Sequence, residues 1–297
     1  MNRLAPVIAS TVLTVVLAGS ASAQIPVLAN NPAPGDLFTN PGPSNQGQAI
    51  GATGWYYNNV RNNGQVGIRT DYPRNGNGSV FFYSGSGAAK ADVEYLVNAA
   101  LIAGNYFSAG IIAPLSDLQT LTYEWYRDSM STVPASLHPA VRILLDADGD
   151  LSTIGDRGGL VWERAYNSLP VPTDTWVADT ITDTSFLWNF GLGIGFAADI
   201  DGNAYPYDET LLEWKNYFPN AVIIGFSMGV GSGWNGIFQG AVDSIAWQGT
   251  GPLANLTSFN FELAGTPVVP EPGTMALLGA GLMLGGLVTL RRARRNR

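Results

Sequence analysis

The chain has 297 residues, of which 46% are hydrophobic and 13% are charged, and its formal net charge at neutral pH is −8. This length allows one large or two small domains, and the absence of cysteine excludes disulfide bridges, thiol catalysis and cysteine-based metal sites. Because an acidic surface repels phosphate groups, we also exclude nucleic acids as binding partners.

Residues 1–23 have the features of a cleavable secretory signal peptide. Arg3 supplies a positive charge, a mostly apolar run extends from Leu4 to Ala18, and Ala21-Ser22-Ala23 forms a small-x-small cleavage site. The apolar run is too short for a stable membrane span. We therefore predict export through the Sec translocon.

Residues 24–51 are rich in Pro, Asn, Gly and Gln and contain few side chains that a core could bury. This composition predicts a flexible linker. Residues 52–266 form the predicted exported domain, in which short apolar runs alternate with turn signals. The first signal, Asn62-Asn63-Gly64, predicts a hairpin turn because Asn and Gly tolerate positive φ.

Several of these runs show the period-2 alternation of half-buried antiparallel strands. The clearest is Val222–Val230, and in a later run Asp243, Ile245 and Trp247 are predicted to share one face. Roughly a dozen short strands of this kind are typical of a single β-sandwich. The main predicted strands are 55–60, 65–72, 79–83, 121–125, 141–145, 222–230, 242–247 and 259–263.

Helix is scarce in the predicted domain. Asp208–Tyr217 is predicted as one short helix, with Asp208 as its N-cap and an end before Pro219. Lys90–Ala103 fits either helix or strand, and its β-branched and aromatic residues favour strand. The predicted fold class is all-β: an antiparallel, jelly-roll-like β-sandwich with one short helix, plus a C-terminal transmembrane helix.

The C-terminal segment 268–297 has three parts in a fixed order. Pro270, Glu271 and Pro272 come first, an uncharged run covers residues 273–290, and five arginines lie within 291–297. As a helix the uncharged run would span about 27 Å, which suits a thin bilayer. Because the arginines resist crossing, an ordinary membrane anchor with a cytoplasmic tail is the simplest interpretation.

The same three parts resemble the PEP-CTERM sorting signal of Gram-negative bacteria that produce exopolysaccharide. The resemblance rests on Val269–Pro272, the Gly/Leu/Ala-rich run and the Arg-rich end. It implies an exported protein that an exosortase-type enzyme processes from an inner-membrane intermediate. The final location would be the cell surface or the extracellular matrix of a biofilm.

The exported body has a stronger charge than the whole chain. Six of the fifteen basic residues and one of the twenty-three acidic residues lie outside residues 24–268, so this body carries a net charge of −13. Such a surface attracts cations. Two Asp-Gly turns place carboxylates at alternate positions, as Ca²⁺ ligands often lie, and the candidate ligands are Asp146, Asp148, Asp150, Asp199 and Asp201.

Neither turn matches the EF-hand loop, because glycine falls at the fourth position and no glutamate stands at the twelfth. Ordinary β-turns that use Asp and Gly for their backbone preferences are the alternative.

The sequence offers little for catalysis. The only histidine, His138, precedes Pro139 at the start of a predicted strand, whereas nucleophilic catalysis needs a base beside the nucleophile. Glu124, Glu163 and Asp243 are the carboxylates that a polysaccharide-active enzyme could use. Such residues on strands are more often simply solvated. We therefore predict a protein that is not an enzyme.

The stretch from Gly231 to Trp247 resembles the closing strands of lectin-like and carbohydrate-binding jelly rolls, through its Gly-rich loop and the Gly-x-Val-Asp-x-Ile segment. The resemblance implies glycan binding, and exopolysaccharide is the expected ligand. Trp234 and Trp188 are the predicted sugar-stacking residues. The alternatives are a structural matrix or coat protein without a small ligand and, third, a polysaccharide-active enzyme.

Overall fold

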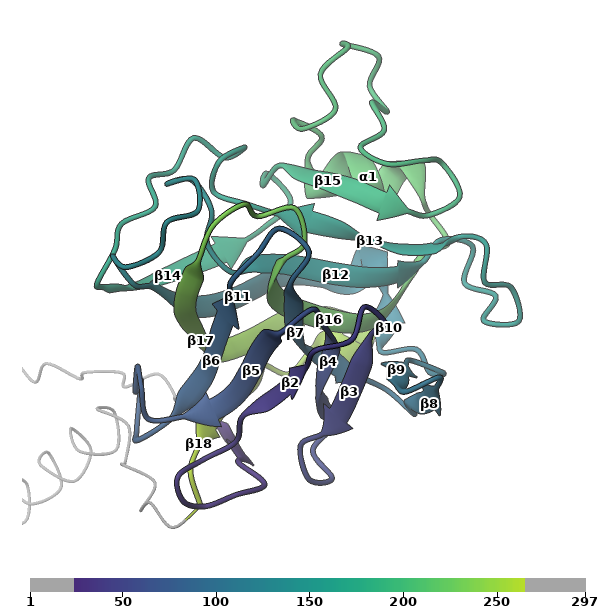
Figure 1. Ribbon diagram of the computed structural model, residues 1–297. Helices are drawn as coiled ribbons and strands as arrows, with labels where there is room; N and C mark the ends of the chain where they lie inside the picture. The colour runs from purple at the N-terminus through teal and green to yellow at the C-terminus, as the bar shows by residue number, and fades with distance from the viewer. Residues whose placement is uncertain (1–23, 265–297) are drawn as a thin grey trace, which may run out of the picture. The chain divides into compact units, whose positions relative to one another are not determined.

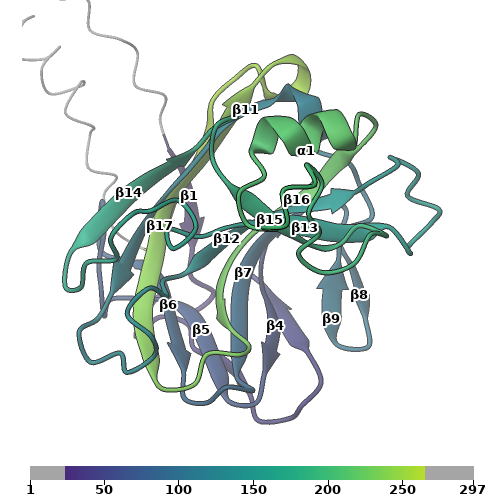
Figure 2. The same ribbon diagram turned by 90° about the horizontal axis from the view of Figure 1, so that it is seen from above.

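The computed structural model describes residues 24–264, which form two eight-stranded β-sheets packed face to face (Figures 1 and 2). The first sheet has the order β1 (Ile25–Leu28), β18 (Thr257–Glu262), β17 (Phe238–Gly249), β6 (Ser79–Ser84), β5 (Gly64–Arg69) and β2 (Phe38–Asn40), with β11 (Leu118–Arg127) paired to β17 and β14 (Trp176–Ile181) paired to β11.

The second sheet has the order β15 (Leu187–Gly191), β13 (Arg157–Trp162), β12 (Ala140–Asp146), β16 (Val222–Gly231), β7 (Lys90–Leu96), β4 (Trp55–Arg61) and β3 (Gln46–Ala49), with β10 (Ala113–Pro114) paired to β16. A small hairpin joins β8 (Ala100–Ile102) to β9 (Asn105–Phe107). The helices are α1 (Leu211–Tyr217) and two 3₁₀ turns, η1 (Leu115–Asp117) and η2 (Gly251–Leu253).

Aromatic side chains fill the space between the two sheets. Trp55 of β4 contacts Phe261 of β18, with ring centroids 5.0 Å apart, and Phe226 of β16 stacks on Trp247 of β17 at 4.4 Å. All four rings are almost completely buried. Because these contacts join strands of different sheets, they show that the apolar faces of the two sheets form one core.

The predicted all-β sandwich with one short helix is therefore confirmed. Lys90–Ala103 contains strands β7 and β8, so the preference for strand over helix, based on its β-branched and aromatic residues, is confirmed. The helix begins later than predicted, with Thr210 instead of Asp208 as its N-cap. The Thr210 hydroxyl accepts the Glu213 backbone N–H, and the Glu213 carboxylate accepts the Thr210 backbone N–H. This capping box satisfies two backbone donors at once, which a lone Asp cap would not.

Residues 24–51 are not a flexible linker. They contain β1, β2 and β3, and the side chains of Val27 and Ile50 are fully buried. The Asp36 carboxylate accepts the backbone N–H groups of Asn30 and Asn31 and so fixes the turn between β1 and β2. Backbone pairing with the longer strands β18, β5 and β4 orders this segment, although its composition is polar.

The turn at Asn62 and Asn63 does not make a hairpin. Both residues have positive φ, as predicted for this turn, but β4 before it belongs to the second sheet and β5 after it to the first. The turn therefore passes the chain from one sheet to the other.

The alternation along β17 also differs from the prediction. Val242, Ile245 and Trp247 all join the core, so the apolar face changes from even to odd positions within the strand. The change occurs at Ser244, which has φ of 52°, and the pairing with β11 shifts register there. This irregularity is a β-bulge, and it explains why Asp243 does not follow the alternation of its neighbours.

The predicted signal peptide 1–23, transmembrane segment 273–290, Arg-rich tail 291–297 and Pro270-Glu271-Pro272 triplet lie outside the described residues. Within residues 24–264, no helix is both long and apolar enough to cross a membrane.

Candidate functional site

Five aromatic side chains gather at the outer edge of the second sheet, where β15 is the terminal strand. Trp188 lies on β15, opposite Val161 of β13. Its ring contacts Phe196 at a centroid distance of 5.0 Å and Tyr207 at 6.4 Å, and Tyr207 in turn stacks on Tyr166 at 4.4 Å. We call this group, whose members are Tyr166, Trp188, Phe196, Tyr205 and Tyr207, the Trp188 cluster.

The Trp188 cluster is open to solvent on one side. Phe196 is 69% exposed and Tyr205 is 51% exposed, whereas Trp188, Tyr166 and Tyr207 are half-buried beneath them. Phe196, Tyr205 and Tyr207 all belong to the loop between β15 and α1, which projects beyond the sheets at the top of Figure 1. Large rings that are exposed close to one another make this loop a candidate interaction surface.

A carboxylate lies beside these rings. The Trp188 indole N–H donates to the Glu163 carboxylate at 3.0 Å. Burial raises the pKa of Glu163, although this hydrogen bond and the positive charge of Arg142 act in the opposite direction. The hydrogen bond fixes the orientation of the Trp188 ring, so the edge of β15 presents this indole in a defined position.

Trp188 is thus a half-buried member of an aromatic surface, but Trp234 is not an exposed ring. Trp234 is only 8% exposed and packs against Phe238, with ring centroids 5.3 Å apart. The Gly-rich loop around it folds the indole back onto the core, where its apolar area is removed from water. The structure therefore contradicts the expectation that Trp234 offers a free face for sugar stacking.

The first Asp-rich turn follows β12, and its buried carboxylate is paired with a positively charged side chain of the protein. Carboxylate oxygens of Asp146, Asp148 and Asp156 lie within 4.8 Å of one another, and Asp156 takes the place that the sequence suggested for Asp150. One Asp146 oxygen pairs with the Arg157 guanidinium at 3.2 Å, and the other accepts the Gly149 N–H. Asp150 instead accepts the Ser152 N–H and hydroxyl.

The second Asp-rich turn lies in the loop of the Trp188 cluster. Carboxylate oxygens of Asp199, Asp201 and Glu209 lie within 4.8 Å of one another, a geometry that could hold a metal ion. Glu209 was missed by sequence reasoning because it follows the turn by several residues. The aromatic pair Tyr205 and Tyr207, close to this turn, was the available signal for the aromatic surface.

His138 is a structural residue. It is almost fully buried, its ring stacks on Trp125 with centroids 4.8 Å apart, and its Nε2 accepts the Arg164 backbone N–H at 2.9 Å. Burial lowers the pKa of His138 to about 3, so the ring stays neutral. An imidazole in this position has no access to a substrate and cannot serve as a general base.

The three candidate catalytic carboxylates do not converge. Glu124 and Asp243 are cross-strand partners in the first sheet, whereas Glu163 follows β13 of the second. Burial alone would raise the pKa of Glu124, but two hydrogen bonds and the charge of Arg74 hold it below its usual value. Asp243 is fully buried and accepts the Phe261 and Ser244 N–H groups.

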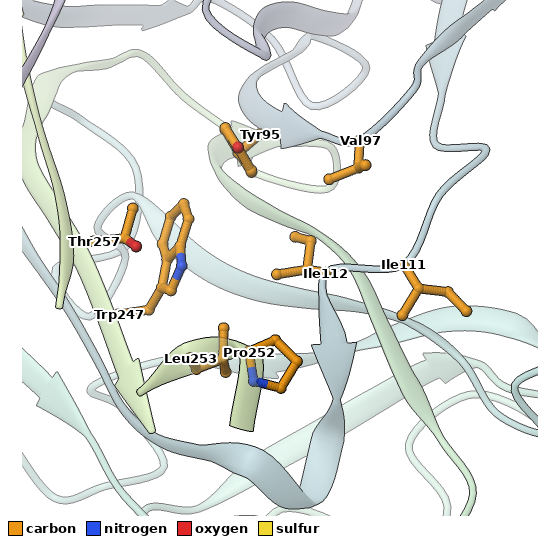
Figure 3. A pocket seen from close by; sticks show the side chains of 8 residues that line it. All are labelled: Tyr95, Val97, Ile111, Ile112, Trp247, Pro252, Leu253 and Thr257. Atoms are coloured by element: carbon orange, nitrogen blue, oxygen red, sulfur yellow. The ribbon is translucent and has the colours of Figure 1, made fainter. Parts of the chain in front are cut away.

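A shallow hollow of about 260 Å³ opens at one end of the core, between β7 and β17. Figure 3 shows the eight side chains around it, with the rings of Tyr95 and Trp247 on adjacent sides; their centroids are 5.1 Å apart. The other lining residues are Val97, Ile111, Ile112, Pro252, Leu253 and Thr257. These side chains include no carboxylate, histidine or basic group, so the hollow supplies no acid–base pair.

Comparison with known families identifies the C-terminal segment. Residues 268–295 match the model of the PEP-CTERM protein-sorting motif, which indicates an exported protein and implies processing by an exosortase-type enzyme. The match covers this segment alone. No curated protein matches the chain.

Two of the solved structures similar to this chain are of a family 11 carbohydrate-binding module from Clostridium thermocellum. The first, from a cellulosomal cellulase, is 10% identical, and the similarity covers 70% of this chain and 87% of the module with a TM-score of 0.34. The second, in complex with a β-1,3-1,4-mixed-linked tetrasaccharide, is 8% identical, covering 73% and 96% with a TM-score of 0.35.

Proposed function

We propose that this exported protein with a PEP-CTERM motif is a non-catalytic glycan-binding module, supported by calcium at an Asp-rich turn. It is delivered through the Sec translocon to an inner-membrane intermediate, and after processing it associates with exopolysaccharide at the cell surface or in the extracellular matrix. Sorting of this kind takes the body to an environment rich in polysaccharide. The observation that carries the proposal is the Trp188 cluster.

The chemistry of the Trp188 cluster suits a sugar ring. A pyranose has apolar C–H faces, which pack on aromatic rings, and hydroxyl groups at its edge, which need hydrogen-bond partners. Phe196 and Tyr205 supply exposed rings, and Glu163, Asp201 and Asn203 supply acceptors or donors in or beside the same loop. Binding energy at such a surface is expected to concentrate in a few aromatic side chains.

The non-catalytic assignment is supported by how the titratable groups are used. His138 is buried and neutral, and Glu124 is held by Arg74. Glycoside hydrolysis needs two carboxylates on either side of one bond, about 5 to 9.5 Å apart in an open cleft. The candidate carboxylates Glu124 and Asp243 lie side by side on one sheet and Glu163 on the other.

The first experiment measures binding of the fragment Gln24–Val268, which forms one compact unit, to exopolysaccharide from the source organism by isothermal calorimetry. We expect saturable binding that weakens about tenfold or more in Phe196→Ala and in Tyr205→Ala, as for residues central to an interface. Because both side chains are largely exposed, neither change should lower the melting temperature appreciably.

Phe107→Ala is the matched control, because Phe107 is an exposed ring on the separate β8–β9 hairpin. This variant should bind as the wild type does. A folded fragment with no saturable binding would reject the proposal in favour of a structural matrix or coat protein. Release of reducing ends from the polysaccharide, lost in Glu124→Gln, Glu163→Gln or Asp243→Asn, would instead establish a polysaccharide-active enzyme.

A further inference from the structure

The carboxylates of the second Asp-rich turn converge from two separate stretches of the loop. Asp199 and Asp201 are exposed on the turn, and Glu209 comes from the end of the loop, directly before the Thr210 cap of α1. The turn is held by its own backbone, since Asp199 accepts the N–H groups of Gly202 and Ala204. Each carboxylate oxygen has two lone pairs, so these bonds leave further acceptor capacity on Asp199.

Glu209 is the unusual member, because it is 0% exposed. One of its carboxylate oxygens accepts the Ile200 N–H at 3.0 Å, whereas the other is buried without any hydrogen-bond partner. A buried oxygen of the adjacent Asp208 also has no partner. Within residues 24–264, no ion pair involves Asp199, Asp201, Asp208 or Glu209. A buried carboxylate oxygen that is neither paired nor hydrogen-bonded is costly, and a bound cation removes that cost.

The first Asp-rich turn provides an internal comparison. There the buried carboxylate of Asp146 is paired with Arg157, so a protein cation already compensates its charge. Both turns have similar sequences, but only the turn at Asp199 leaves a buried carboxylate oxygen unsatisfied. The structure therefore distinguishes two motifs that the sequence could not.

We propose that Asp199, Asp201 and Glu209 bind one Ca²⁺ ion, which fixes the loop that carries Phe196, Tyr205 and Tyr207. Oxygen-only ligands in an irregular loop suit Ca²⁺ better than Mg²⁺, which requires a tighter octahedron. The ion joins the turn to the residue before α1, and this closes the loop around the Trp188 cluster. Glycan binding by this cluster then depends on calcium, a consequence that rests on the proposed function.

The test begins with calcium alone, without glycan. Fragment Gln24–Val268, freed of metal by chelation, is titrated with CaCl₂ in a calorimeter, and its melting temperature is measured with and without the ion. We expect one site per chain and a rise in melting temperature on adding calcium. Glu209→Gln keeps the shape of the side chain and removes its charge, so calcium should bind at least tenfold more weakly, and the rise in melting temperature at a given calcium concentration should be smaller.

Asp148→Asn, in the first Asp-rich turn, is the matched control and should bind calcium as the wild type does. Because Glu209→Gln removes a buried charge, we expect its melting temperature without calcium to equal or exceed that of the wild type. Absence of calcium binding by the folded wild type would overturn the proposal. Wild-type affinity in Glu209→Gln would also overturn it.

Glycan titrations with calcium and with chelator separate this inference from the proposed function. Glycan binding that is lost on chelation supports both. Glycan binding that persists in chelator, from a protein that binds calcium, overturns the dependence on calcium and leaves the glycan module standing. Calcium binding without any glycan binding keeps the metal site and rejects the glycan module.

Discussion

Asp92 and Glu94 are two buried carboxylates on the same face of β7. Asp92 pairs with Lys90 and with Arg142 of β12, each at 3.1 Å, so two cations compensate its charge. Glu94 accepts amide N–H groups from Asn58 at 2.6 Å and from Asn59 at 2.9 Å, and within residues 24–264 it forms no ion pair. Burial, and after it the charge of Asp92, raises the pKa of Glu94 to about 7, although the hydrogen bonds from Asn58 and Ser227 and the charge of Lys90 act in the opposite direction. The pKa of Glu94 is thus raised because no cation pairs with it directly.

This difference predicts a dependence of stability on pH. An unfolded glutamate titrates near 4.5, so between that pH and about 7 the folded state keeps a proton that the unfolded state has lost. Stability from Glu94 is therefore full below pH 4.5 and is lost as pH rises through 7, by on the order of 3 kcal/mol in total. Denaturant titrations of wild type and Glu94→Gln at pH 5 and pH 8 measure the effect.

Comparison at each pH cancels the contributions of other titrating groups. The wild type should lose stability relative to Glu94→Gln as the pH rises. Parallel pH profiles for the two proteins would show that Glu94 is ionised throughout this range.

Single residues were the hardest features to predict from the sequence. Trp188 and Trp234 both lie near turn residues, and the contact with Phe238 that buries Trp234 depends on how the loop returns to the core. Glu209 and Asp156 join their clusters through loop geometry, which residue spacing does not specify. Asp146, by contrast, was found from its Asp-x-Asp-Gly motif, because that motif acts within a few residues.

At the scale of the elements, the position of the loop between β15 and α1 depends on how its two ends are held. It begins at the terminal strand of the second sheet and finishes at the capping box of Thr210 and Glu213. Leu211 and Trp214 bury the first turn of α1 in the core. The cap therefore fixes the position at which Glu209, the preceding residue, enters its cluster.

Replacing Thr210 by alanine removes the side-chain half of this capping box. We expect a loss of about 1 kcal/mol, which corresponds to a fall in melting temperature of roughly 2 to 4 °C for a domain of this size. Thr173→Ala, at an exposed loop position, is the control and should leave the melting temperature unchanged. Equal melting temperatures for both variants would mean that packing alone holds the start of α1.

Strands were predictable where they are long and their apolar residues recur with period 2. Val222–Val230 is a strand, as predicted, and it pairs with β7 and β12. The strand is buried on both faces, however, and its pairing with β12 shifts register so that the core face changes from Ile223 to Phe226, Met228 and Val230. The sequence did not predict β3, whose residues Gln46-Gly-Gln-Ala49 carry no apolar pattern and pair through the backbone with β4. Nor did it predict the bulge at Ser244, because a change of face requires knowledge of the partner strand.

For the whole molecule, sorting and binding are assigned to different parts of the chain. The PEP-CTERM motif covers residues 268–295, whereas the two sheets and the Trp188 cluster lie within 24–264. The two-sheet class was predictable because it depends on the number and period of strands. The distribution of strands between the sheets was not, as the turn at Asn62 and Asn63 shows.

Replacing Pro270, Glu271 and Pro272 by alanine tests the sorting part separately. We expect the full-length protein to accumulate in the membrane fraction, because the triplet that an exosortase-type enzyme would recognise is gone while the apolar run remains. Immunoblots of membrane and secreted fractions distinguish the full-length from the processed form. Normal amounts of the processed form would show that the triplet is not required.

The pairing of β1 with β18 sets an order of events during folding. β18 lies between β1 and β17, and Gln24 at the start of the body hydrogen-bonds to Ser258, 234 positions later. β1, the first strand of the body to be synthesised, therefore finds its partner only after nearly the whole body has followed. Contacts so distant in sequence form slowly, and until then the edges of β1 and β17 stay unpaired. The body completes its first sheet only once β18 has been synthesised.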